Sequence, residues 1–289
     1  MAAQLIEGKS LSLSLKEKIK EQVEKLALAG VVPGLTVILV GEDPASQIYV
    51  RNKEKGCEQV GIASQTIRMP EDTTQEQLEA EITRLNKDEN VDGILVQLPL
   101  PKHLDEAAAL SLILPEKDVD GFHIYNTGKL FNGQDTVVAC TPKGVMEMIH
   151  TTGVSLAGKE AVVVGRSNNV GKPIAILLLQ ENATVTVCHS KTKDLASHTR
   201  RADILVAAVG RARFITADMI KPGAVVIDVG INRVDGKVMG DVDFEGAKEV
   251  AGYITPVPGG VGLLTVTMLL ANTVELAGRR LARMQNENA

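Results

Sequence analysis

Short apolar runs alternate with segments of helical periodicity along most of this chain. Apolar runs of strand length lie at residues 35–40, 93–98, 161–164, 184–188, 204–209 and 224–229. Helices are predicted between and around them, at residues 14–29, 44–60, 75–85, 104–112, 141–150, 174–180 and 264–283. Strands that alternate with helices in this way indicate a parallel sheet, so the predicted fold class is α/β.

The alternation occurs in both halves of the chain. A loop at residues 115–122 and a helix that opens at Thr141-Pro142 separate the halves, and we expect that helix to bridge two domains. A length of 289 residues is enough for two domains with sizeable cores.

Composition narrows the class of protein without identifying a function. Hydrophobic residues make up 44% of the chain and charged residues 23%, which is ordinary for a soluble globular protein. The net charge of −5 argues against a nucleic-acid partner. Aromatic residues are only 2% of the chain, with no tryptophan, which argues against platforms for base stacking.

The cysteines and histidines argue against metal chemistry. Cys57, Cys140 and Cys188 are widely spaced and odd in number, which indicates a reducing compartment and no zinc site, so we expect a cytoplasmic protein. The five histidines form no H-x-x-x-H pair and no catalytic triad. The N-terminal segment lacks the apolar core of a signal peptide, and the apolar stretch 261–271 is too short to span a bilayer.

The stretch 161–173 has the order strand, glycine turn and helix that binds the phosphates of a dinucleotide. Gly165 ends the apolar run, and Gly171 stands at the start of the helix. The N–H groups at a helix start point toward a pyrophosphate bound there. The pattern reads G-x-S-x-x-x-G, because Ser167 replaces the usual second glycine. The motif favours nucleotide binding, and the alternative is an ordinary strand–helix turn.

The end of the next strand indicates which nucleotide binds. An NAD site places an acid there to hold the ribose 2′-hydroxyl, but none occurs before Asp194. His189, Ser190 and Lys191 follow the strand instead, and Arg166 lies in the first turn. Cations and hydroxyls suit a 2′-phosphate, so the sequence favours NADP. For Lys191 a solvated loop charge is an equally good explanation.

Lys53 is a candidate base in the first half of the chain. At 100° per residue one face of the helix 44–60 carries Ser46, Tyr49, Lys53, Gly56, Cys57 and Val60. A lysine among small and apolar residues is partly desolvated, which lowers its pKa and lets it act as a base. The alternative is a lysine whose stem covers a core face while its amine reaches solvent, and geometry alone does not separate the two.

Further polar positions lie at and beyond the strand 93–98. Gln97 interrupts the apolar run near the carboxyl end of the strand, where open α/β sheets bind ligands. The alternative is a glutamine that bonds the backbone of the following loop. Asp118 and Asp120 have no partner acid at metal spacing, so by themselves they read as turn residues.

Several longer stretches match one family in the same order. They are GEDPASQIYVRNK (41–53), DGILVQLPLP (92–101), PEKDVDGFH (115–123), CTPKGV (140–145), VVVGRSNNVGKP (162–173), AVVIDVGIN (224–232) and YITPVPGGVG (253–262). On these stretches the chain resembles the bifunctional methylenetetrahydrofolate dehydrogenase/cyclohydrolases of folate metabolism. The stretches span nearly the whole chain and are together highly specific, which the glycine motif alone is not.

The resemblance implies two α/β domains with a cleft between them that holds the active site, the second domain being a Rossmann-type parallel sheet. Residues 1–140 would bind folate and carry catalysis, completed by a C-terminal helix over 264–289, and residues 141–263 would bind NAD(P). The family implies tetrahydrofolate substrates and often a homodimer formed through the nucleotide domains. We expect no membrane partner and no nucleic-acid partner.

The resemblance also implies roles for single residues. Lys53 would be the catalytic lysine, Gln97 the residue that tunes it, and Tyr49 the ring that packs along the folate. Asp120 would anchor the pterin, with Pro258 and Gly259 near the folate. The predicted NADP contacts are Gly165, Arg166, Ser167, Val170, Gly171, His189, Ser190 and Ile231.

The implied chemistry has two steps. Hydride transfer from 5,10-methylenetetrahydrofolate to the nicotinamide gives the methenyl compound and needs orientation more than an acid or a base. Water then attacks the methenyl cation to give 10-formyltetrahydrofolate, with Lys53 as base and later as proton source. The rivals are a nucleotide sensor that has lost the chemistry, against which the intact Tyr49, Lys53 and Gln97 argue, and an NADP dehydrogenase with another small substrate.

The chain departs from the family at one place. The family usually continues GGVG with Pro-Met-Thr, whereas Leu263, Leu264 and Thr265 stand here. We expect the loss of this proline to remove a residue that presets the first position of the last helix. The change touches no proposed catalytic residue.

Overall fold

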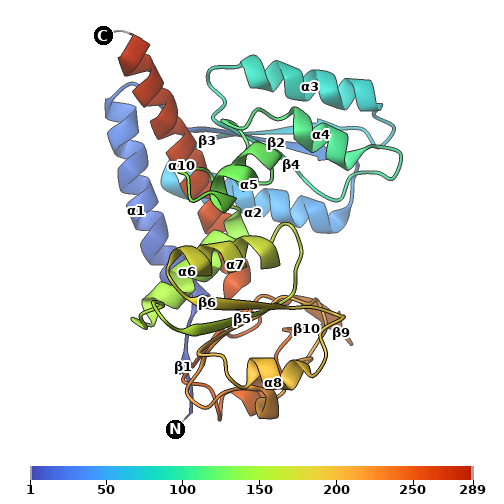
Figure 1. The fold of residues 1–289 in the computed structure, drawn as a ribbon. Coiled ribbons are helices and arrows are strands. Elements are labelled where there is room, and N and C mark those ends of the chain that lie inside the picture. Colours follow the sequence, from blue (N-terminus) through green and yellow to red (C-terminus); the bar gives the residue numbers. More distant parts are fainter. Residues whose placement is uncertain (1, 288–289) are drawn as a thin grey trace. The chain divides into compact units, whose positions relative to one another are not determined.

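The computed structural model describes residues 2–287, which form two compact α/β units (Figure 1). The three-stranded unit comprises Ser14–Val138 and the chain from Val266 onward. The six-stranded unit comprises the residues before Ser14 and Ala139–Thr265. The division falls within the helices α1 (Gly8–Leu28) and α10 (Val261–Glu287).

The three-stranded unit is built on a parallel sheet in the order β3-β2-β4. Its central strand is buried at every residue, as a continuous apolar run predicts. Helices α3 and α4 cover one face and α2 lies on the other (Figure 1). The elements are β2 (Gly34–Val40), α2 (Pro44–Val60), β3 (Ala63–Met69), α3 (Gln75–Lys87), β4 (Gly93–Val96), α4 (Glu106–Leu112) and α5 (Ile124–Phe131).

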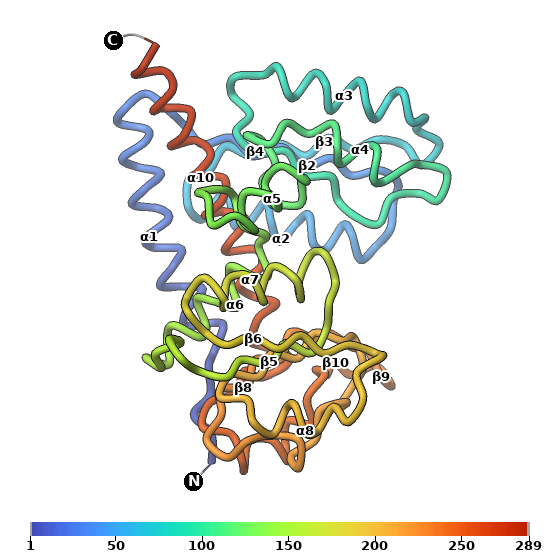
Figure 2. Tube along the Cα trace, in the orientation of Figure 1, coloured from blue at the N-terminus to red at the C-terminus, as the bar shows by residue number. Residues whose placement is uncertain are grey.

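The six-stranded unit is built on a second parallel sheet, in the order β1-β11-β8-β7-β5-β6. Helices α6 and α7 lie on one face, and α8 lies on the other (Figures 1 and 2). The elements are β1 (Gln4–Leu5), α6 (Cys140–Thr151), β5 (Glu160–Val164), α7 (Gly171–Gln180), β6 (Thr184–Cys188), α8 (Leu195–Thr199), β7 (Ile204–Ala207), the 3₁₀ helix η1 (Ala217–Met219), β8 (Val225–Asp228), β9 (Asn232–Val234), β10 (Lys237–Met239), α9 (Phe244–Ala247) and β11 (Tyr253–Ile254).

The strand order of this sheet indicates which strand ends would bind a ligand. From β6 to β11 it follows the 2-1-3-4-5 order of doubly wound sheets, with β1 added beyond β11. The order reverses between β5 and β7, and ligands of such sheets bind at the carboxyl ends of the strands on either side of that reversal. These ends are Val164 and Ala207, which are partners in register. The expected parallel sheet of the second domain is confirmed.

Several elements differ from those predicted. Strand β3 was missed because its sequence, ASQTIRM, is largely polar and it lies exposed at a sheet edge. Helix α5 was missed because it is short and follows a loop rich in turn residues. Helix α1 begins at Gly8, six residues before the predicted start.

The last helix also begins earlier than expected, at Val261 instead of residue 264. Leu263 therefore lies in the first turn, where its N–H donates to the carbonyl oxygen of Gly260 at 3.2 Å. The expectation that the missing proline would stand at the first helical position is wrong, because position 263 is the third residue of the helix.

Among the described residues, α10 is the one helix that is long and apolar enough, by length and composition, to cross a membrane. It includes the stretch 261–271 that seemed too short in the sequence. In its most apolar window 61% of the residues are buried inside the protein. Such burial is typical of a core helix, so the length of α10 is weak evidence for a membrane span.

Arg280 joins α10 to the sheet of the three-stranded unit. Its guanidinium donates to both carboxylate oxygens of Asp92, at 2.7 and 3.0 Å, and the Asp92 side chain is only 2% exposed. Removing one partner of a buried pair leaves a charge without compensation. We therefore expect Arg280→Ala to lower the free energy of unfolding, measured by urea denaturation, by about 3 kcal/mol.

The neighbouring Arg279 provides the control for this prediction. It pairs with Asp135, whose side chain is 92% exposed, and with Glu275 one turn earlier on the helix. Exposed pairs contribute little, so Arg279→Ala should change the free energy of unfolding by less than about 1 kcal/mol. Equal losses in the two variants would show that burial of the Asp92 carboxylate is not what makes Arg280 important.

Candidate functional site

Helix α2 carries Lys53 and has both ends fixed by its sequence. The Asp43 carboxylate accepts from Ser46 N–H at 2.7 Å, Pro44 takes the first position, and Gly61 ends the helix with φ +82°. The predicted bounds, N-cap and stop are confirmed. The predicted face is buried at Ser46, Gly56, Cys57 and Val60, whereas Tyr49 is half-exposed.

Lys53 and Gln97 lie side by side. The Lys53 Nζ donates to Gln97 Oε1 at 2.7 Å, although the two residues are 44 positions apart. Gln97 Nε2 donates to the Leu98 carbonyl oxygen, also at 2.7 Å, which turns the amide oxygen toward the lysine. Gln97 is buried, and its backbone N–H continues the β4 ladder by donating to Ile38 O. The expected bond to the backbone of the following loop is confirmed, and the same amide also accepts from the lysine.

The loop 115–122 separates the roles of its two aspartates. Asp118 accepts from His123 N–H at 2.8 Å and from Asn126 Nδ2 at 2.9 Å, so it takes the turn role that the sequence predicts. The carbonyl oxygen of Val119, the residue between the aspartates, accepts from Asn272 Nδ2 on α10 at 2.9 Å. The loop is thus held from both sides.

Asp120 lies within reach of the charge of Lys53. Desolvation by burial raises the pKa of its carboxyl group to about 6, and the charge of Asp118 acts in the same direction. The positive charge of Lys53 opposes this rise. Lys53, Gln97 and Asp120 thus form one group of side chains, which we call the lysine centre. It holds an amine, a neutral amide and a carboxyl group whose pKa is raised by burial.

The glycine turn of the six-stranded unit follows β5. Gly165 has φ +131°, and a Cβ on it would collide with the Ala208 carbonyl oxygen. A Cβ on Gly171 would collide in the same way with the carbonyl oxygen of Gly165. Val170, the N-cap of α7, gives no side-chain capping bond, and Ser167 Oγ accepts from Gly171 N–H at 3.3 Å. The two glycines bring the backbone close to the helix start, and this cradle fits a pyrophosphate.

The turn after β6 lies at the same end of the strands, the carboxyl end. Gly165 N–H donates to the Cys188 carbonyl oxygen at 2.9 Å, so Arg166 and His189 follow neighbouring strand ends. Within this turn, His189 N–H donates to Thr192 Oγ1 at 2.9 Å, and His189 Nδ1 accepts from Lys191 N–H at 3.1 Å. Arg166 and Ser190 are both exposed.

A small pocket in the same unit brings together residues predicted for two different ligands. Its volume is about 180 Å³, and it is lined by Ile231, predicted to contact the cofactor, and by Pro258 and Gly259, predicted to lie near the folate. Glycines at 260 and 262 also line it, which leaves room for a flat ring to approach the backbone.

Sequence reasoning missed two aspartates beside this pocket. Asp228 and Asp241 are both buried, and they accept hydrogen bonds from backbone N–H groups in several loops. Burial raises the pKa of Asp228 to about 6, although its backbone N–H donors act against the rise. An acid at the end of the apolar run 224–229 was the one signal in the sequence that pointed to this pair.

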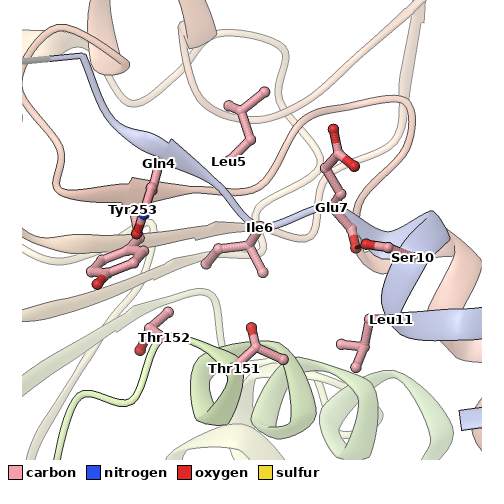
Figure 3. A pocket seen from close by; sticks show the side chains of 9 residues that line it. All are labelled: Gln4, Leu5, Ile6, Glu7, Ser10, Leu11, Thr151, Thr152 and Tyr253. Atoms are coloured by element: carbon pink, nitrogen blue, oxygen red, sulfur yellow. Dashed lines mark hydrogen bonds between the residues drawn. The ribbon is translucent and has the colours of Figure 1, made fainter. Parts of the chain in front are cut away.

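Another cavity of the six-stranded unit, of about 330 Å³, contains none of the predicted site residues (Figure 3). Its walls come from β1, the start of α1, the end of α6 and Tyr253, which is the register partner of Gln4. The cavity holds hydroxyl groups but no cluster of catalytic groups. Across residues 2–287, no group of three or more His, Cys, Asp or Glu side chains is placed to hold a metal ion.

Comparisons with known proteins agree on one family. Residues 6–120 match the model of the tetrahydrofolate dehydrogenase/cyclohydrolase catalytic domain, and residues 139–281 match that of the NAD(P)-binding domain of the same family. A bifunctional protein FolD of Bacillus cytotoxicus is 58% identical over 280 residues, which cover 96% of this chain and 98% of that protein.

Solved structures give the same answer. The bifunctional FolD of Campylobacter jejuni has a TM-score of 0.94 and is 49% identical, covering 96% of this chain and 100% of that one. The Trypanosoma brucei enzyme, which was solved with NADP and an inhibitor, has a TM-score of 0.90 and is 42% identical, covering 96% of this chain and 98% of that one.

Proposed function

The chain belongs to the tetrahydrofolate dehydrogenase/cyclohydrolase family, and we propose that the residues described above carry out the two reactions of that family. The protein oxidises 5,10-methylenetetrahydrofolate to 5,10-methenyltetrahydrofolate with NADP and hydrolyses the product to 10-formyltetrahydrofolate. The 2.7 Å bond between Lys53 and Gln97 is the observation that carries the assignment of residues, because it holds an amine on a neutral acceptor.

We assign the folate and the hydrolysis to residues 1–140 with the C-terminal segment 264–289, and the nucleotide to residues 141–263. Residues 1, 288 and 289 of this assignment lie outside the described residues. The lysine centre supports the first assignment, and the glycine turn after β5 supports the second. Tyr49 lies one turn before Lys53 on α2, half-exposed, where its ring can pack along a bound folate. The carboxyl group of Asp120 can hold the polar edge of the pterin.

NADP supplies, when bound, the nicotinamide that accepts the hydride. Gly165 and Gly171 let the backbone approach the pyrophosphate, with Ser167 and Val170 in the same turn. Arg166 and Ser190, with His189 before it, provide the charge and hydroxyl that suit a 2′-phosphate. Ile231, Pro258 and Gly259 give the pocket walls that keep water from a bound ring.

In the hydrolysis, the neutral amine of Lys53 takes a proton from water as the water oxygen bonds to the methenyl carbon. The bond from that carbon to N5 then breaks, and the lysine returns the proton to N5. Loss of the hydroxyl proton from the new formyl group balances the reaction, which consumes one water and releases one proton. The oxygen of Gln97 keeps the amine in place without adding a negative charge.

Arg166→Ala should weaken the binding of NADP far more than that of NAD. The guanidinium pairs with a 2′-phosphate that only NADP carries, so its loss should raise the KM for NADP by about tenfold or more and change the KM for NAD little. Initial rates with each nucleotide give both constants.

Arg201→Ala is the matched control for this prediction. Arg201 lies in the same unit and bonds Thr186 of β6 and pairs with Glu160. It should leave both KM values within about twofold. Equal losses for the two nucleotides in the Arg166 variant would contradict the assignment of this residue to the 2′-phosphate.

We also propose that the protein is a cytoplasmic homodimer. The three cysteines, which all lie within the described residues, are buried and form no disulfide, which is compatible with a reducing compartment. The family relation supports a dimer formed through the nucleotide-binding residues. Light scattering on the purified chain tests this, and a monomer at micromolar concentration would contradict it.

Hydride-transfer assays distinguish the proposed function from the two alternative functions. A purified protein that reduces NADP with 5,10-methylenetetrahydrofolate is neither a nucleotide sensor nor a dehydrogenase for another substrate. A protein that binds NADP but reduces none with this folate would contradict the proposal.

A further inference from the structure

Asp241 is a fully buried carboxylate enclosed by hydrogen-bond donors. Its Oδ2 accepts from the N–H groups of Val209 and Gly210, at 2.6 and 2.9 Å. Its Oδ1 accepts from Arg211 N–H at 2.8 Å and from Asn232 Nδ2 at 2.9 Å. Successive backbone N–H groups that converge in this way form an anion-binding concavity, and here the protein fills it with its own anion.

Asp228 extends this network to a second loop. It accepts from Gly230 and Asp241 N–H at 3.0 and 2.8 Å, and from Val242 N–H at 2.9 Å. A Cβ on Gly230 would collide with the Asp241 carboxylate, and one on Gly240 would collide with the Asp228 carboxylate. The two aspartates therefore pack directly against these two glycines, and neither glycine has room for a side chain in this arrangement.

The loops held in this way lie at the carboxyl ends of neighbouring strands, and the first of them follows β7, which flanks the reversal of strand order. Residues 208–211 follow β7 and residues 229–231 follow β8, and these two strands are register partners at Ala207 and Asp228. The second loop ends at Ile231, which lines the 180 Å³ pocket together with Asp228 and Gly230. The network thus fixes the backbone that we propose to contact the nucleotide.

We propose that Asp241 is a positioning residue for NADP: its carboxylate holds the loop after β7, and through Asn232 the end of the loop after β8, in the shape that the nucleotide requires. The inference rests on the proposed function, since it assumes that this edge of the sheet binds NADP. A carboxylate suits the task because it has no donor, so each of its four partners can only point inward. An asparagine would turn an NH₂ group toward N–H groups and push part of the loop away.

Asp203 offers a matched comparison at the amino ends of the strands, opposite the ends that we expect to bind the ligand. It precedes β7, and its carboxylate accepts from Glu160 N–H at 3.0 Å and from Lys221 Nζ at 2.7 Å. Asp203→Asn therefore makes the same chemical change, next to the same strand, but at the amino end where no ligand is expected.

The test uses the independence of the two reactions, because hydrolysis of the methenyl compound needs no nucleotide. In Asp241→Asn we expect the dissociation constant for NADP, measured by calorimetry on the full chain, to rise about tenfold or more. Hydrolysis of 5,10-methenyltetrahydrofolate without nucleotide should stay within about twofold of wild type. Asp203→Asn should leave both within about twofold.

An unchanged dissociation constant in a folded Asp241→Asn protein would overturn the proposal, and so would a proportional loss of both properties. If that variant does not fold, the dissociation constant for NADP is measured on Asn232→Ala instead. This substitution removes one of the four donors and keeps the carboxylate. A smaller rise in the same direction supports the proposal, and no rise overturns it. An inactive wild-type protein would instead contradict the proposed function itself.

Discussion

Replacing Lys53 with methionine lowers the hydrolysis of 5,10-methenyltetrahydrofolate by about 10²- to 10⁴-fold, the range typical of a lost general base. Methionine keeps an unbranched stem of similar length and removes the amine. The bond to Gln97 Oε1 is lost with it, so the orientation of the amide also becomes less fixed. The measurement is the rate of loss of the methenyl compound at saturating concentration, corrected for the uncatalysed reaction.

Lys55→Met is the control for this prediction. Lys55 lies two residues further along α2 and is exposed, so the same substitution there changes the charge of the helix but not the lysine centre. It should leave hydrolysis within about twofold of wild type. A hydrolysis rate near wild type in the Lys53 variant would contradict the role of Lys53 as base.

Gln97→Glu should suppress hydrolysis at neutral pH and move the pH profile of kcat to the alkaline side. A carboxylate at hydrogen-bond distance favours the protonated amine and raises the pKa of a lysine by about 1–3 units. Since the base must be neutral, each unit of this rise removes about nine-tenths of the active form at a pH below the pKa. We therefore expect a shift of about 1–3 pH units.

Gln59→Glu provides the matched control. Gln59 Oε1 accepts from Lys16 Nζ at 2.8 Å, so the chain contains a second lysine–glutamine bond, but this pair is exposed. The same substitution there should leave the pH profile unchanged. If Gln97→Glu raises the KM for the folate while the pH profile of kcat stays in place, Gln97 binds substrate or backbone and does not tune the lysine.

The family resemblance implied the pairing of Lys53 with Gln97, and the sequence pattern around each residue agrees with it. Helical spacing places Lys53 on a small and apolar face, and the continuous apolar run before Gln97 places Gln97 just beyond the carboxyl end of a buried strand. Parallel packing of a helix and a strand in one unit then brings the two side chains together. The caps Asp43 and Gly61 fix the helix, so its register was also predictable.

The division of work between Asp118 and Asp120 could not be predicted from spacing. Both lie in one loop without periodicity, and their roles depend on partners elsewhere in the chain. Asn126 donates to the carboxylate of Asp118. Asn272 lies 153 residues beyond Val119 and donates to the Val119 carbonyl oxygen, between the two aspartates. The network around Asp241 was invisible for the same reason, because its donors come from the loop after β7 and from Asn232 at the start of β9.

Strand β3 illustrates a different limit. It pairs with β2 along seven residues, yet its exposed side chains leave no apolar alternation to recognise. Strand β3 is defined by its backbone hydrogen bonds to β2. A search for apolar patterns in the sequence therefore does not detect it.

The product formed from 5,10-methylenetetrahydrofolate and NADP tests the central claim most directly, namely that one chain carries out both reactions and that Lys53 serves the second. Wild-type protein should reduce one NADP for each 10-formyltetrahydrofolate released, with little methenyl compound present. The Lys53→Met protein should accumulate the methenyl compound for as long as it reduces NADP. Release of the formyl product at the wild-type rate by that variant, or no reduction of NADP by the wild type, would contradict the account.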